Sequence, residues 1–193
     1  MAVKAVAAVA ACAVAAAYFV AMIGVIPQLY LEYYTAYPTL THHVSVSDSN
    51  IPLGESFSLR IDVDNEYDQA DILITSVSFP SLEGNLEDHV RLVRYDFGMA
   101  PLYLEAGDAA GVVYGAGSAE IVHPTIRSTG VDVAAGDKHH VEFLITPPTE
   151  GDFEMQIKTT AVPHSHSKAH YPHSGFVDTQ GEFVEIHVVG VFG

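Results

Sequence analysis

Residues 56–64 read SFSLRIDVD, and apolar and polar side chains alternate strictly along them. Phe57, Leu59, Ile61 and Val63 occupy every second position, with serine, arginine and aspartate between them. A period of two is typical of a half-buried antiparallel strand, because successive side chains of a strand point to opposite faces of its sheet. The segment therefore predicts a strand that turns these four side chains toward a core.

Two further segments repeat the alternation, and the residues expected to face inward are His139, Val141, Phe143 and Ile145 in one, and Phe153, Met155, Ile157 and Thr159 in the other. Weaker strand candidates are 43–47, 72–79, 90–95, 112–114, 119–123 and 182–191. Turn-forming residues separate them, as at 52–54, 83–85, 135–137 and 147–152. About seven to nine strands in one domain of this size indicate an all-β sandwich.

Two longer segments, LGESFSLRIDVDNEYDQADILITSVSF (53–79) and AAGDKHHVEFLITPPTEGDFEMQIKTTAV (134–162), resemble immunoglobulin-like domains of the arrestin-like or CARDB-like sort found on prokaryotic cell surfaces. In the first, a Gly-Glu turn leads into an alternating strand that ends at Asn65. In the second, Pro-Thr-Glu-Gly-Asp-Phe connects two strands. The resemblance implies a Greek-key sandwich used for adhesion, spacing or assembly, and it implies no catalytic residues.

The N-terminal segment has a different character. Ala5 to Ile26 contains no charged residue, and a helix of that length measures roughly 33 Å at about 1.5 Å per residue, close to the hydrocarbon thickness of a bilayer. Lys4 precedes the segment and every acid follows it. The positive-inside tendency therefore predicts a single-pass protein of the cell membrane with a cytoplasmic N-terminus and an extracytoplasmic C-terminal domain.

We expect residues 1–31 to form this transmembrane anchor and residues 39–193 to form the sandwich. Tyrosines suit the membrane interface because the ring can lie among headgroups while the hydroxyl stays in water; those that follow the apolar segment are Tyr30, Tyr33, Tyr34 and Tyr37. A cleaved signal peptide is the alternative, although cleavage after a small-residue triplet such as 13–15 would leave residues 18–26 exposed on the mature protein.

Small residues recur at every fourth position of the apolar segment, in two stripes: Ala8, Cys12 and Ala16, and Ala13, Ala17 and Ala21. Small side chains at this spacing let a second helix approach closely in lipid, which would make the chain a subunit of a larger membrane assembly. The alternative is that alanine serves only as an apolar helix former.

The outer domain is strongly acidic. The whole chain carries a formal charge of −16, and all 24 acids but only seven of the eight bases lie beyond residue 31, so that part carries 7 − 24 = −17. A surface of this kind repels phosphate backbones and offers no basic stripe to neutralise them. Nucleic acid is therefore not an expected partner, and solubility is the simplest explanation of the acids.

Histidines are the second compositional signal, since the chain has eleven of them. Four lie close together between the last two expected strands: His164, His166, His170 and His173. Neutral imidazoles are ligands of copper and zinc, and short histidine-rich tracts indicate metal binding. We expect these four as candidate ligands, with His42 and His43 as possible additions. Weak adventitious binding and a purely solvating role remain alternatives.

No catalytic motif is present. The chain has no Gly-x-Ser-x-Gly, His-Glu-x-x-His or phosphate-binding glycine loop, and its one cysteine, Cys12, lies in the apolar segment. The sequence therefore favours a non-catalytic, membrane-anchored interaction or structural subunit of a cell-envelope or membrane complex, whose partners are other transmembrane subunits or envelope proteins. The alternative function is a histidine-rich copper- or zinc-binding envelope protein that serves a membrane enzyme.

Overall fold

The computed structural model describes residues 9, 11–18, 38–66, 69–111, 118–163, 171–177 and 183–193. The chain divides into two compact units, Met1–Ala36 and Tyr37–Gly193. In the first unit, residues 11–18 are helical and exposed. None of the helices within the described residues is both long enough and apolar enough to span a bilayer.

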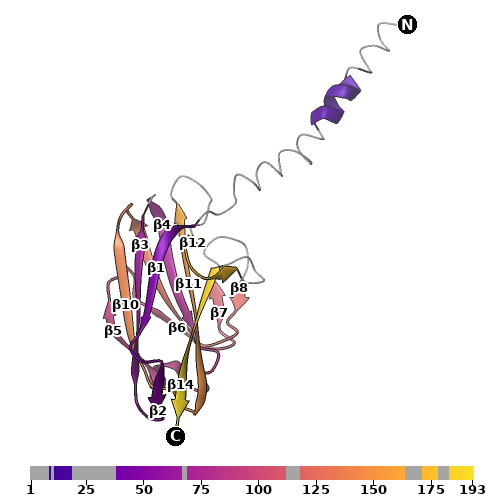
Figure 1. The fold of residues 1–193 in the computed structure, drawn as a ribbon. Helices are drawn as coiled ribbons and strands as arrows, with labels where there is room; N and C mark the ends of the chain where they lie inside the picture. Colours follow the sequence, from indigo (N-terminus) through magenta and orange to yellow (C-terminus); the bar gives the residue numbers. More distant parts are fainter. Residues whose placement is uncertain are drawn as a thin grey trace, which may run out of the picture. The chain divides into compact units, whose positions relative to one another are not determined.

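In its described residues, the second unit consists of strands and one helical turn (Figure 1). The elements, in chain order, are β1 (Pro38–Val46), β2 (Asn50–Pro52), β3 (Phe57–Asn65), β4 (Ala70–Ser78), α3 (Leu86–His89), β5 (Val90–Tyr95), β6 (Leu102–Leu104), β7 (Ala109–Gly111), β8 (Ser118–Glu120), β9 (Thr125–Val133), β10 (Lys138–Ile145), β11 (Gly151–Pro163), β12 (Tyr171–Pro172), β13 (Phe176–Val177) and β14 (Phe183–Phe192).

The strands form two main sheets. Sheet A has five strands in the order β12-β1-β3-β10-β5, and all its pairs are antiparallel except β12 with β1. Sheet B has seven strands: six follow the order β13-β14-β11-β4-β9-β6, and β2 pairs in parallel with β14. A separate two-stranded sheet joins β7 and β8. The expected all-β sandwich of two sheets is confirmed.

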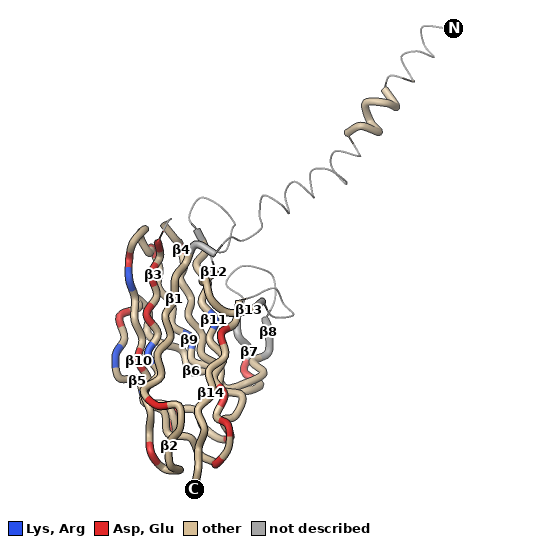
Figure 2. Tube along the Cα trace, viewed as in Figure 1, with Lys and Arg blue, Asp and Glu red and all other residues tan. Residues whose placement is uncertain are grey.

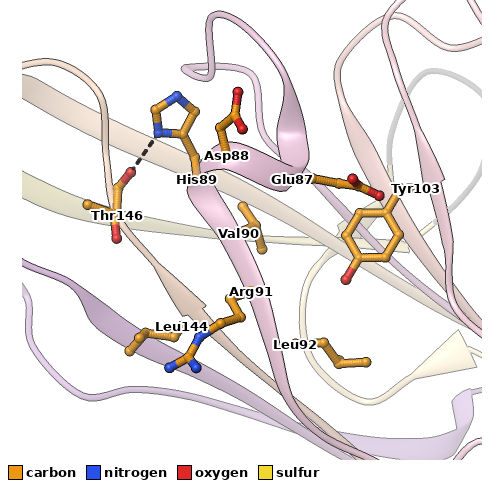
Figure 3. Close-up of a pocket in the computed structure, with 9 residues that line it drawn as sticks. All are labelled: Glu87, Asp88, His89, Val90, Arg91, Leu92, Tyr103, Leu144 and Thr146. Atoms are coloured by element: carbon orange, nitrogen blue, oxygen red, sulfur yellow. Dashed lines mark hydrogen bonds between the residues drawn. The ribbon is translucent and has the colours of Figure 1, made fainter.

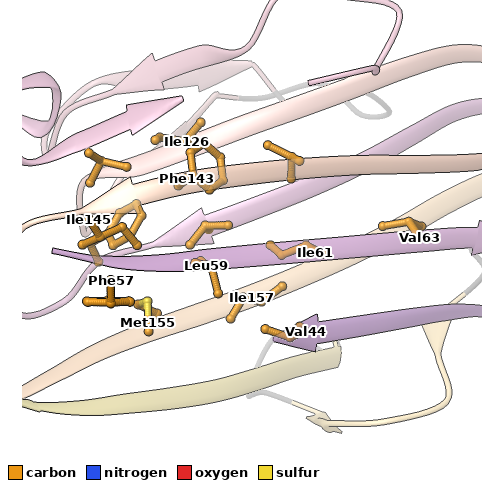
Figure 4. Close-up of a cluster of buried hydrophobic side chains, with 14 of the residues drawn as sticks. Val44, Phe57, Leu59, Ile61, Val63, Ile126, Phe143, Ile145, Met155 and Ile157 are labelled. Carbon is orange, nitrogen blue, oxygen red and sulfur yellow. The ribbon is translucent and has the colours of Figure 1, made fainter. Parts of the chain in front are cut away.

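The core lies between the sheets and is built from the alternate residues that the sequence indicates (Figure 4). Phe57, Leu59, Ile61 and Val63 on β3 are all buried, as are the inward residues Phe153 to Thr159 of β11. The rings of Phe57 and Phe153 meet edge to face across the sheets, with their centroids 6.1 Å apart. Burying large apolar side chains is the main source of stability in a domain without disulfides.

Candidate functional site

Four polar side chains join the two sheets at one edge of the sandwich, and we call them the Glu185 cluster: His42 on β1, Ser174, and Glu185 and His187 on β14. The Nε2 of His42 lies 2.6 Å from Oε2 of Glu185, and the Nε2 of His187 lies 2.6 Å from Oε1 of the same carboxylate. The hydroxyl of Ser174 donates to Oε2 at 3.0 Å. One carboxylate of sheet B therefore receives hydrogen bonds from three side chains.

The alternation of side chains along β1 and β14 turns His42, Glu185 and His187 toward the space between the sheets. His42 has the same parity as the buried Leu40 and Val44, so it faces the space between the sheets. Glu185 and His187 share the parity of Val189 and Val191, which are buried on β14. The side chain of His42 is only 1% exposed, whereas that of Glu185 is 22% exposed. The cluster therefore joins a fully buried histidine, His42, to a carboxylate, Glu185, that is accessible to water.

The electrostatics follow from this burial. Desolvation lowers the pKa of His42 below its ordinary value, although Glu185 opposes the shift. Burial alone would raise the pKa of Glu185, but the hydrogen bonds from His42, His187 and Ser174 together lower it. With Glu185 ionised and His42 neutral, the Nε2–H of His42 must donate. Its Nδ1 is then a buried acceptor that has no hydrogen-bond partner among the described residues.

The neighbouring histidines His42 and His43 point to opposite faces of sheet A. His42 points inward, but His43 is exposed on the outer face of sheet A, where it lies opposite Asp62 of β3. Asp62 in turn lies opposite His140 of β10, whose Nδ1 is 2.7 Å from Oδ2 of Asp96. His43, Asp62 and His140 border a depression of about 440 Å³, in which Nη2 of Arg60 lies 2.7 Å from Oδ1 of Asp62.

Of the expected metal ligands, His173 is described and is exposed, with its Nε2 3.7 Å from Oε2 of Glu66. It directly follows β12, which pairs with the first residues of β1 through Pro38↔Tyr171 and Leu40↔Pro172. The end of the histidine tract is thereby held beside β1, the strand that carries His42. His164, His166 and His170 lie outside the described residues. No group of three histidine, cysteine or acidic side chains in the described part is arranged to hold a metal ion.

The anchor predictions fall partly outside the described residues. Cys12, Ala13, Ala16 and Ala17 lie in the helical segment 11–18 and are exposed. The remaining positions, Ala8, Ala21, Tyr30, Tyr33, Tyr34 and Tyr37, lie outside the described part.

The sequence prediction missed Glu185, His187 and Ser174. The only signal was the spacing Glu-x-His on an alternating strand, which puts both side chains on one face. That signal is common in solvated strands. Only the pairing of the sheets shows that the face in question looks toward His42.

A second hollow of about 550 Å³, which we call the β5 groove, surrounds the start of β5 (Figure 3). Val90, Leu92, Tyr103 and Leu144 supply its apolar surface. Figure 3 shows the acids at one end and Arg91 at the other; the remaining lining residues are Glu87, Asp88, His89 and Thr146. The ring of His89 is 3.2 Å from the carbonyl of Thr146, which ties the end of α3 to the end of β10.

No known family model and no curated protein sequence matches the chain. Among solved structures, the CARDB domain of the PF1109 protein from Pyrococcus furiosus, in complex with di-metal ions, is 9% identical and has a TM-score of 0.40, and the match covers 81% of this chain and 90% of that one. The full-length major pilin SpaD of Corynebacterium diphtheriae is 12% identical with a TM-score of 0.40, covering 68% and 33%.

A β-glucosidase from Listeria innocua in complex with glucose is 14% identical with a TM-score of 0.39, and the match covers 81% of this chain but 16% of the enzyme. These chains are similar to this one only at the level of overall strand arrangement.

Proposed function

We propose that the chain is a non-catalytic, membrane-anchored, extracytoplasmic interaction or structural subunit of a cell-envelope or membrane protein complex, built on an immunoglobulin-like Greek-key sandwich. The strand order supports the fold part of the proposal. The chain passes from β3 in sheet A to β4 in sheet B, back to β5 in sheet A, and on to β6 and β9 in sheet B. It then returns to sheet A at β10 and crosses again to β11 in sheet B. Repeated crossing between two antiparallel sheets is typical of immunoglobulin-like sandwiches.

One observation carries the interaction role, an exposed apolar row on the outer side of β14. Ile186, Val188 and Phe192 are 42%, 48% and 53% exposed, and they alternate with the inward residues of the same strand. Exposed apolar side chains grouped on one element of an otherwise acidic domain favour a role in binding another protein. We call this set the β14 row.

The test is co-purification of the tagged full chain from its native membranes in a mild detergent. We expect a stoichiometric partner that is lost when Val188→Glu adds a charge to the β14 row. The matched control is Val131→Glu on the outer side of β9, because Val131 is also 48% exposed on the same sheet. A solitary monomer, or equal loss with both variants, would count against the interaction role.

Membrane attachment is tested separately. The uncharged segment Ala5 to Ile26 supports the anchor, and we expect the full chain to stay with the membrane after alkaline extraction. Protease added outside intact cells should remove the domain. A chain that is released by alkali, or that is protected from the protease, would contradict the proposed topology.

A second candidate is copper or zinc binding by the histidine tract, and the pairing of β12 with β1 favours it. That pairing holds His173, at the end of the tract, beside the strand that carries His42, and Oε2 of Glu66 lies 3.7 Å from Nε2 of His173. Imidazole and carboxylate together are ligands of Zn²⁺ and Cu²⁺. In titrations with either ion we expect His42→Ala and the fourfold alanine variant of the tract each to weaken binding. A titration that neither change alters would remove this candidate.

A further inference from the structure

Sheet A ends at β5, and this edge differs from the rest of the domain. Among the described residues β5 pairs with β10 on one side only. Alternate residues of such an edge strand turn their backbone N–H and C=O groups outward, where an added strand can pair with them. The pairing with β10 also contains a bulge, because Glu142 faces Arg94 and Phe143 faces Leu92, so that Val93 is the extra residue.

Sheet A also carries most of the positive charge, and two of its cations, Arg91 and Arg94, lie on β5. The domain is acidic overall, yet four of its cations lie on strands of sheet A: Arg60, Arg91, Arg94 and Lys138 (Figure 2). Three of them face acids of the same sheet, since Arg60 binds Asp62, Arg94 lies 3.6 Å from Glu142, and Lys138 binds Asp64. Arg91 is exposed and makes no hydrogen bond or ion pair with any described residue.

The β5 groove lies at the same place. Its apolar residues Val90, Leu92 and Tyr103 are next to the open edge. An edge that served only to prevent aggregation would need the bulge and the arginines, but not an apolar hollow of about 550 Å³ beside them. The combination matches what an extended peptide requires: backbone groups to pair with, a hollow for alternate side chains, and a charge that selects the sequence.

We propose that the β5 edge is a docking site for an extended acidic segment of another protein, which adds to sheet A with apolar side chains in the β5 groove and carboxylates against Arg91 and Arg94. A second copy of this chain is the wrong occupant. Pairing β5 with itself would bring the arginines of the two copies close to one another, and like charges across a strand pair are destabilising. Glu87 and Asp88 fix the direction by excluding carboxylates from the α3 end.

The experiment uses the full chain in detergent and a fluorescent peptide in which valine alternates with two glutamates in the first half and two threonines in the second. If the peptide docks antiparallel to β5, these glutamates lie on the side of Arg91 and Arg94 and away from Glu87 and Asp88. We expect saturable binding that Arg91→Ala weakens about fivefold, since an exposed ion pair contributes up to about 1 kcal/mol. Arg60→Ala is the matched control, because it removes the same charge from the same face but from β3.

Two further peptides test the mode of binding. Replacing the glutamates by lysines should abolish binding, and methylating the backbone nitrogens that face β5 should do the same, since it removes the donors of an added strand. The proposal is overturned if the lysine or methylated peptide binds equally well, or if Arg91→Ala and Arg60→Ala behave alike. It is also overturned if the chain forms a dimer that Arg91→Ala disrupts and the glutamate peptide does not. In that case Arg91 would contact a second copy of the chain and not an acidic segment of another protein.

This inference goes beyond the β14 row, which lies on the other sheet. A partner that co-purifies through Val188 while the peptide fails to bind would leave the interaction role intact and remove the β5 site. If the peptide binds but no partner co-purifies through the β14 row, the β5 site stands and the interaction role of the β14 row is removed.

Discussion

At the scale of single residues, His42 shows how burial and charge compete in this domain. It is buried between the sheets, where its Nε2–H donates to Glu185, and in the described part of the chain no group hydrogen-bonds to its Nδ1. The sequence could suggest the histidine as a metal ligand because of its neighbour His43. It could not show that the two rings face opposite sides of sheet A, because the inward partner lies 143 positions away in the chain.

His42 should make stability depend on pH. Its pKa is lowered from 6.5 in the folded state, so the unfolded chain binds more protons as the pH falls below that value, and the folded state loses stability. Between pH 7 and pH 5 we expect the free energy of unfolding, measured with urea on the full chain in detergent, to fall less in His42→Leu than in the wild type. Glu185, whose pKa is lowered from 4.5, adds a further loss at lower pH.

The control for this prediction is His43→Leu, which makes the same change at the outward-facing neighbour. Identical slopes for the wild type and His42→Leu would show that the buried ring does not titrate in this range.

Gly175 is a second residue whose role depends on tertiary structure. Its φ is +111°, and a Cβ at this position would lie 2.7 Å from the carbonyl oxygen of Val184. We expect Gly175→Ala to lower the free energy of unfolding by about 1–3 kcal/mol, because both the backbone conformation and the contact oppose a side chain. Gly98→Ala, where no atom lies within 4 Å of the added carbon, should change it by less than about 0.5 kcal/mol. Equal effects would contradict the assigned strain.

At the scale of elements, alternation identified several strands of both sheets. The range 90–95 coincides with β5, and the inward faces of β3 and β11 are buried as expected. The sequence did not indicate β9, although it pairs with β4 along its whole length. Ser128 and Gly130 occupy inward positions of β9, so the strand lacks the apolar alternation by which the others are recognised. Its pairing with β4 and β6 makes it a strand.

The two faces of a strand should differ sharply in their contribution to stability. Phe143 on β10 is fully buried, whereas Phe192 at the end of β14 is 53% exposed. We expect Phe143→Ala to lower the free energy of unfolding by about 3–5 kcal/mol, since it removes a buried ring and leaves a cavity. Phe192→Ala should cost less than about 1 kcal/mol. Denaturant unfolding of both variants gives the comparison, and similar losses would mean that the β14 row is covered within the chain.

At the scale of the whole molecule, composition and periodicity were enough to predict an all-β sandwich, because every strand must bury one face against a second layer. They could not give the order of the strands, since pairing between distant strands such as β3 and β10 depends on how the complete set of faces fits together. The same limit applies to the β5 groove, which exists only because α3 and β6 meet the end of sheet A.

The two ends of the sandwich have a mechanical consequence. β1 begins where β12 holds its first residues, and the chain ends at the opposite pole, after β14 (Figure 1). A pull between Pro38 and Gly193 would therefore load β1 and β14 along their lengths, and the ladders to β3 and β11 would have to break together. In optical-tweezers extension of the full chain we expect one abrupt rupture, at lower force in Val44→Pro, which interrupts the β1 ladder. Smooth lengthening without a rupture would exclude a tension-bearing role for the domain.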